Sequence, residues 1–177
     1  MRIALAIALL LGACGDPEPE PLPPRVRKPG EPRRVIVERI LISYRGNPFG
    51  IESRYSLEDA EALARRVYRR ARSGEDFRKL RNDYSQDRTG PIGAALGPYI
   101  VLNYGVKQAP TMPHVARMLR EGLGHSFGDI AFQMAKDEIA LVEYDERLYP
   151  AGFEILLCRA RDDRTEAQVE EDLKKPR

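Results

Sequence analysis

Apolar and polar residues along this chain follow two periods, one typical of strands and one typical of helices. Residues 34–44 (RVIVERILISY) are dense in β-branched side chains, which favour the extended conformation. Only Glu38 and Arg39 break the apolar run, so we predict a strand that is buried on both faces over much of its length.

A helical period replaces the strand period further on. Apolar residues recur at helical spacing from Leu57 to Ala71, and Ser56 precedes them as a suitable N-cap. Acidic residues stand near the start of this segment and arginines follow, an order that suits the helix dipole and explains the arginines as a solvated face. A second, shorter helix is predicted over residues 77–84.

The second half of the chain predicts shorter elements. Pro113 is placed to open a helix that Gly122 ends. Three strands are predicted at 126–134, 138–144 and 152–159, after an earlier short one at 99–102. The expected class is α+β, a small antiparallel sheet covered by helices in the order β-α-α-β-α-β-β with an extra strand or insertion.

The N-terminus has the pattern of an export signal. Met1-Arg2 precedes an apolar run over residues 3–11, which is shorter than the roughly 20 residues that span a bilayer. Leu11-Gly12-Ala13-Cys14 is similar to the lipobox of bacterial lipoproteins, in which the cysteine thiol carries the lipid. We therefore predict that residues 1–13 are removed and that acylated Cys14 anchors the protein to a membrane. The alternative is an ordinary signal peptide with an incidental cysteine.

Proline enrichment marks a tether between this anchor and the predicted domain. Residues 14–33 are rich in proline and charge, so we expect them to stay extended as a semi-rigid spacer. The expected organisation is a signal peptide (1–13), the tether (14–33), a folded domain (34–160) and a charged tail (161–177) with a helix over 165–175. Gly15 after the cysteine favours the outer membrane over the inner one by the enterobacterial sorting rule, within the cell envelope.

Composition excludes several classes of function. Lys and Arg total 29 against 27 Asp and Glu, which gives no basic excess for nucleic-acid binding. Two histidines, His114 and His125, cannot form a three-histidine metal site, and two cysteines cannot form a four-cysteine zinc site. Without a phosphate-binding glycine loop or a Ser-His-Asp set, we expect no metal and no cofactor. Cys158 is expected to be a buried, reduced thiol.

Motifs in a constant order resemble the parvulin family of peptidyl-prolyl cis-trans isomerases. The resemblance covers about residues 35–160 and implies the parvulin fold. It rests on Glu38-Arg39-Ile40-Leu41-Ile42, Gly74-Glu75-Asp76-Phe77, Tyr84-Ser85-Gln86-Asp87, Gly93-Ala94-Ala95-Leu96-Gly97, Leu119-Arg120-Glu121-Gly122 and Gly152-Phe153-Glu154-Ile155-Leu156.

The departures from this family fall on its chemistry. Parvulins place two histidines side by side on neighbouring central strands, and those positions here are Arg39 and Glu154. Asp87 matches the position where the family has Asp or Cys, which implies a catalytic candidate. The resemblance also implies a prolyl pocket lined by Met112, Gln108, Leu96 and Phe153, of which Met112 and Gln108 replace the usual Phe and Met. An insertion is expected near residues 144–150.

Loss of both histidines at once suggests that an ion pair has replaced them. A buried unpaired charge is costly, so we predict that Arg39 and Glu154 pair across neighbouring strands. Three functions remain open: a domain that binds extended or proline-containing segments of exported proteins with weak or no turnover, an active isomerase, and an unrelated structural envelope lipoprotein. The first two imply exported polypeptides as partners, and the anchor implies the membrane.

Overall fold

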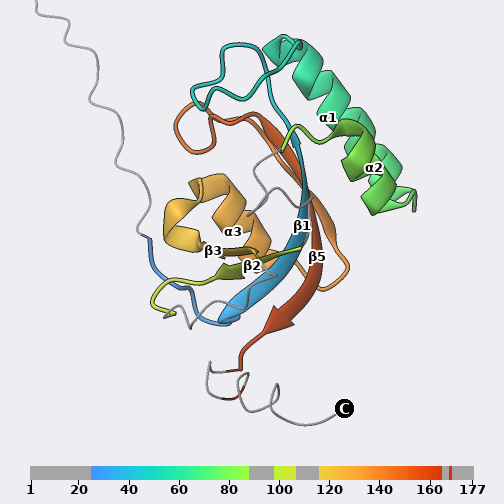
Figure 1. Ribbon diagram of the computed structural model, residues 1–177. Helices are drawn as coiled ribbons and strands as arrows, with labels where there is room; N and C mark the ends of the chain where they lie inside the picture. The colour runs from blue at the N-terminus through green and yellow to red at the C-terminus, as the bar shows by residue number, and fades with distance from the viewer. Residues whose placement is uncertain (1–24, 88–97, 107–115, 165–167, 169–177) are drawn as a thin grey trace, which may run out of the picture.

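A single sheet covered on both faces forms the core of this protein in a computed structural model that describes residues 25–87, 98–106, 116–164 and 168. Within these residues five strands pair in the order β3-β2-β1-β5-β4. The strands are β1 (Arg34–Ile42), β2 (Tyr99–Leu102), β3 (Ala116–Leu119), β4 (Ile139–Val142) and β5 (Phe153–Asp162). The helices are α1 (Leu57–Arg72), α2 (Phe77–Tyr84), the short 3-10 turn η2 (Arg120–Gly122) and α3 (His125–Gln133). Helices α1 and α2 lie on one side of β1 and β5, and α3 lies on the other (Figure 1).

The α+β class and the expected order of elements are confirmed, with β3 as the extra strand. The sheet is antiparallel except where β2 and β3 run parallel. The long central pair, β1 and β5, extends from Arg34 opposite Asp162 to Ile42 opposite Phe153. Residues alternate between the two faces of these strands, so each central strand supplies side chains to both layers of the core.

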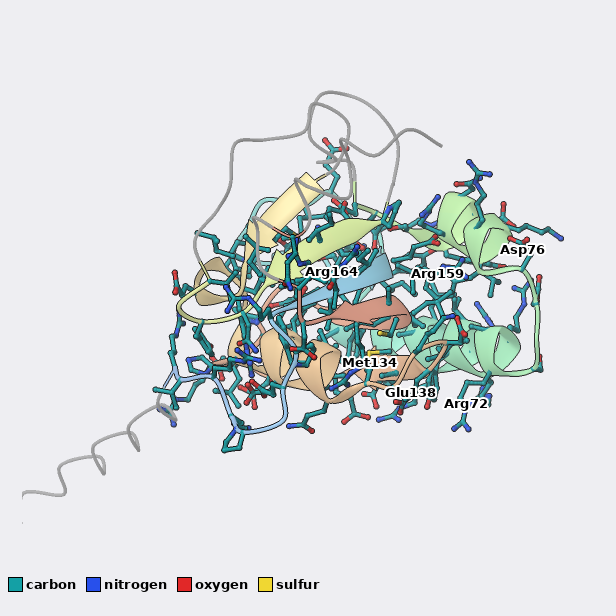
Figure 2. The ribbon with its side chains drawn as sticks, turned by 90° about the horizontal axis from the view of Figure 1, so that it is seen from below. Arg72, Asp76, Met134, Glu138, Arg159 and Arg164 are labelled. Carbon is teal, nitrogen blue, oxygen red and sulfur yellow. The ribbon has the colours of Figure 1, made fainter. Side chains whose placement is uncertain are left out.

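The layer under α1 forms as the sequence predicts. Ser56 caps α1, because the Asp59 N–H donates to the Ser56 Oγ at 3.0 Å. The apolar face of α1 packs on Ile40 and Ile42 of β1 and on Phe153 of β5. Arg72 and Asp76, on either side of the turn between α1 and α2, lie at one end of the molecule (Figure 2).

The two predictions between residues 113 and 134 are wrong. Residues 126–134 were expected to form a strand, but the structure has helix α3 there, whose Phe127, Ala131 and Phe132 are buried against the sheet. These three residues recur at i, i+4 and i+5, a helical spacing that the strand propensity of Phe127, Ile130 and Phe132 obscured. The expected helix over 113–121 is instead strand β3 and turn η2 from Ala116 onward, because pairing with β2 outweighs the helix propensity of a four-residue segment.

The end of the expected tether belongs to the folded domain. Residues 25–33, here named the N-terminal strap, lie against η2 and α3, and Glu31 and Pro32 are buried. Arg120 donates to Glu31 Oε2 at 2.7 Å, and the Asn103 amide donates to the Pro32 carbonyl at 2.9 Å. The strap is held against the domain because the Glu31 carboxylate pairs with the buried Arg120 guanidinium. The proline content of this segment did not predict that interaction.

Two further expectations can be compared with the structure. Cys158 is a buried free thiol, as predicted, and burial raises its pKa. The helix expected over 165–175 lies outside the described residues except for Gln168. In the described part of the chain, no helix is long and apolar enough to cross a membrane.

Candidate functional site

The two central strands bring Arg39 and Glu154 together. Leu41 of β1 stands opposite Glu154 of β5, and Arg39 is two residues away on the same face. The Arg39 Nη1 donates to Glu154 Oε1 at 3.1 Å, so the predicted ion pair is confirmed. Gly152 allows the chain to pass close to the end of β1 here, since a Cβ there would meet the Ile42 carbonyl oxygen at 2.5 Å and its φ is +132°.

The neighbouring residue Glu38 points to the opposite face and also pairs. Its carboxylate accepts from Arg81 of α2 at 2.7 Å and from Arg159 of β5 at 2.6 Å. The polar break in the first predicted strand therefore consists of two residues with separate partners. Only Arg39 faces the candidate site.

Asp87 enters the site from the end of α2. The backbone there is fixed to β1, because the Gln86 N–H donates to the Leu41 carbonyl at 2.8 Å and the Leu41 N–H donates to the Ser85 Oγ at 3.1 Å. The Arg39 Nε then donates to Asp87 Oδ2 at 2.8 Å. The guanidinium therefore holds two carboxylates at once, where the sequence predicted one.

Two tyrosines complete this group. The Tyr99 hydroxyl donates to Asp87 Oδ2 at 2.6 Å, its ring lies 4.8 Å from the Arg39 guanidinium, and the Tyr149 hydroxyl donates to Glu154 Oε1. Sequence reasoning missed Tyr149, although it lies in the expected insertion at 144–150, where the Tyr149 N–H donates to the Asp145 carbonyl at 2.9 Å. We name Arg39, Asp87, Tyr99, Tyr149 and Glu154 the buried charge cluster.

The buried charge cluster contains one cation and two carboxylates in a nearly dry environment. Side-chain exposure is 12% for Arg39, 1% for Asp87 and 0% for Glu154. Burial opposes the charge on Arg39, but Glu154 and Asp87 outweigh it and raise the guanidinium pKa. Burial also raises the pKa of the Glu154 carboxyl, an effect that Arg39 and Tyr149 partly offset. Burial and the hydrogen bond to Asp87 raise the pKa of Tyr99 to about 12.

Glu154 should make wild-type stability depend on pH. Its carboxyl pKa is raised in the folded protein above the ordinary 4.5, so folding favours the protonated form. The stabilising contribution is complete below pH 4.5 and is lost as the pH rises through the folded-state pKa. Relative to Glu154→Gln, the wild type should therefore lose up to about 1.4 kcal/mol of unfolding free energy per pH unit in that range. Urea unfolding of both proteins from about pH 5 to pH 8 measures this difference; a constant difference would contradict it.

A cleft opens next to the buried charge cluster. Its volume is about 1050 Å³, and Arg39, Asp87, Tyr149 and Glu154 contribute to its lining. Apolar and aromatic side chains of the lining come from several elements: Leu41, Phe49, Ile51, Tyr55, Tyr84, Met118 and Leu123. The cleft therefore combines apolar walls with a charged floor.

The residues expected to line a prolyl pocket are only partly placed. The assignment of Phe153 to the pocket is corrected by its position in the core under α1. It lies on the opposite face of the sheet from Glu154, so it cannot contact a ligand in the cleft. The other three, Met112, Gln108 and Leu96, lie outside the described residues.

The histidines lie away from the two central positions, as far as they are described. His125 begins α3 and accepts a hydrogen bond from Arg25 of the strap at 3.1 Å. His114 lies outside the described residues. Over residues 25–87, 98–106 and 116–164, no group of three metal-binding side chains is found.

Comparison with known families identifies the family of this chain. Residues 25–149 match the family model described as PPIC-type PPIASE domain. The chain belongs to this family. The match begins with the N-terminal strap and ends at Tyr149, before Glu154. The recognition of a parvulin-type domain is therefore confirmed.

Two solved structures of proteins named PrsA are similar to this chain. The crystal structure of PrsA from Bacillus subtilis is 17% identical with a TM-score of 0.45, and covers 80% of this chain and 40% of its own. PrsA from Bacillus cereus is 18% identical with a TM-score of 0.43, and covers 81% of this chain and 40% of its own. The similarity thus spans less than half of either PrsA chain. No curated protein matches this chain.

Proposed function

We propose that this PPIC-type domain binds extended, proline-containing segments of exported proteins and that its isomerase turnover is weak or absent. The observation that supports this proposal best is the engagement of the Arg39 guanidinium by two buried carboxylates. The charged side chains at the base of the cleft are engaged by one another, whereas the apolar side chains that line it remain available to a ligand.

The chemistry of isomerisation explains why this engagement opposes turnover. Rotation about a peptide bond faces a barrier of about 18–20 kcal/mol, and a catalyst must stabilise the twisted amide more than the planar one. Donors that achieve this must be preorganised toward the amide. Arg39 instead donates to Asp87 and Glu154, and moving it toward a substrate would leave both carboxylates buried without a cation, at a cost of several kcal/mol.

Binding requires less of the site than catalysis does. A prolyl ring is apolar, and Leu41, Met118 and Leu123 line the cleft beside the buried charge cluster. An apolar concave surface with a few fixed polar groups is the usual form of a ligand site in proteins. The cleft can therefore hold a proline-containing segment without any change in the ion pairs.

A charge introduced into the cleft wall should test binding. Met118 lines the cleft, whereas Leu119, the next residue of β3, is exposed and does not. Met118→Lys should weaken binding of a fluorescent proline-containing peptide by at least about tenfold, because an ammonium would lie against apolar surface. Leu119→Lys is the matched control and should bind like the wild type in fluorescence anisotropy. Equal binding by both variants would place the peptide elsewhere.

An active isomerase is the second candidate function. The observation that favours it is Asp87, which stands at the position where parvulins have Asp or Cys and borders the cleft with hydrogen bonds to Arg39 and Tyr99. Turnover that depends on Asp87 would support this candidate. Binding without turnover supports the first.

We further propose that a lipid on Cys14 holds the domain in the cell envelope, and at the outer membrane in preference to the inner one. The lipobox at residues 11–14 supports this location, and residues 15–24 remain as a spacer before the strap. Metabolic labelling with a fatty acid should mark the wild type and not a Cys14→Ala variant. Equal labelling of both would contradict the anchor.

A further inference from the structure

We infer that the cleft selects client segments that carry a large apolar side chain a few residues from the proline, and that Phe49 recognises this side chain. The inference rests on the proposed binding function and specifies its substrate class. It is drawn from the loop between β1 and α1. Neither Arg39 nor Glu154 lies in this loop.

Phe49 is an exposed aromatic residue that borders the cleft. The large apolar side chains that stay exposed in the described part of the chain are Val26, Phe49, Leu57 and Leu119. Phe49 is the most exposed of them at 62%, and it is the one that contributes to the cleft lining. An exposed aromatic at the edge of a concave site is a common anchor for a binding partner.

The loop holds Phe49 in place before any ligand arrives. The side chain of Asn47 is buried, and its amide donates to the carbonyls of Tyr44 at 3.0 Å and Ile51 at 2.6 Å. Its Oδ1 accepts from the backbone N–H groups of Phe49 and Ile51, both at 3.1 Å. Four hydrogen bonds from one side chain therefore fix the turn, which lowers the entropy cost of binding at Phe49.

Gln86 joins this loop to the buried charge cluster. Its side chain accepts from the Ser43 N–H at 2.7 Å and donates to the Glu52 carbonyl at 2.9 Å. The next residue, Asp87, belongs to the cluster. The apolar edge and the charged floor are thus two parts of one connected cleft.

The geometry of β1 gives the approximate spacing on the client. The loop leaves β1 at Ser43, four residues after Arg39, which corresponds to about 13 Å of extended chain. A client segment in the cleft is also extended and rises by about 3.3 Å per residue. The length of β1 between Arg39 and this loop therefore corresponds to a spacing of about three to five client residues between the proline and the apolar side chain.

The chemistry of this edge favours an uncharged apolar side chain. Ile51 and Tyr55 line the cleft on the same loop as Phe49. The loop carries charges of both signs, since it contains Glu52 as well as Arg45 and Arg54. Burial of one large apolar side chain against Phe49 corresponds to a gain of about tenfold in affinity.

A peptide scan tests this inference on the full chain. In a proline-containing peptide that is otherwise polar, a single leucine is moved through each position from five before to five after the proline. Fluorescence anisotropy should show about tenfold tighter binding of the wild type to peptides with leucine at one or two of these positions. For each variant the affinity for the leucine peptide is divided by its own affinity for the leucine-free peptide; this ratio should fall from about tenfold to about one in Phe49→Ser and should stay near the wild-type ratio in Phe49→Leu.

Leu57→Ser is the matched control, because Leu57 is an exposed apolar residue that does not line the cleft. It should keep the full preference, and circular dichroism should show every variant folded. If no peptide binds the wild type, the proposed binding function fails. If peptides bind without a leucine preference, or if Phe49→Ser retains the preference, this inference fails while the binding function stands.

Discussion

Replacing Arg39 with methionine should lower the free energy of unfolding by about 3–5 kcal/mol. The substitution removes the cation from Asp87 and Glu154, whose side chains are 1% and 0% exposed. Two carboxylates would then share a buried site without a countercharge, and the tyrosine hydroxyls of Tyr99 and Tyr149 would be their remaining donors among the cluster residues. Thermal unfolding should show a decrease in Tm of about 10 °C.

Removing the two buried carboxylates as well should restore the stability that Arg39→Met loses. In a triple variant that combines Arg39→Met with Asp87→Asn and Glu154→Gln, the buried charges are absent, so most of the lost stability should return. Arg66→Met, on the exposed face of α1, should change stability by less than about 0.5 kcal/mol. A stable single variant, or a triple variant no better than the single one, would show that the buried charges are not what Arg39 neutralises.

Replacing Arg120 with methionine should cost a similar amount, about 3–5 kcal/mol. Arg120 is 1% exposed and donates to Glu31 at 2.7 Å, to Asn103 at 2.9 Å and to Asp129 at 2.5 Å. Its guanidinium also lies 4.7 Å from the Phe132 ring. Removal of this cation leaves the buried Glu31 carboxylate without a countercharge, with the Lys28 N–H and the Asn103 amide as its remaining donors.

The loss should be largest at the strap. Trypsin should cleave after Arg25 and Arg27 at least about tenfold faster in Arg120→Met than in the wild type, because the strap would detach before the sheet unfolds. Glu31→Gln in the same chain should recover part of the stability. Arg65→Met, which removes exposed ion pairs with Glu61 and Glu143, is the matched control and should leave the cleavage rate unchanged. Equal cleavage of Arg120→Met and wild type would show that Arg120 does not hold the strap.

Local periodicity predicted the elements that depend on it. The strand at 34–44 and the helix capped by Ser56 are where the sequence places them, since their apolar residues follow one clear period. Helix α3 was misassigned because its aromatic and β-branched residues also suit a strand. The four residues of β3 depend on pairing with β2, a contact between distant segments that no local pattern encodes.

The residues of the candidate site also differ in whether the sequence could predict them. Arg39 and Glu154 could be paired from sequence because the family resemblance places both on adjacent central strands. Tyr149 could not, because it reaches the cluster from the segment between β4 and β5, which carries none of the motifs on which the family resemblance rests. It fits there partly because Gly124 lacks a side chain, since a Cβ at that position would collide with the Tyr149 ring. Phe153 was assigned to the pocket by its motif, whereas strand alternation places it on the other face from Glu154.

The central claim is that the cleft binds proline-containing segments, and that the contacts within the buried charge cluster keep isomerase turnover weak or absent. NMR exchange spectroscopy on a proline peptide with the wild-type protein measures binding and cis-trans exchange in one sample. We expect shifted peptide resonances that report binding, with an exchange rate within about twofold of the uncatalysed value, which corresponds to tens of seconds. Exchange accelerated by about a hundredfold or more, and lost in Asp87→Ala, would contradict the claim and identify the domain as a working isomerase.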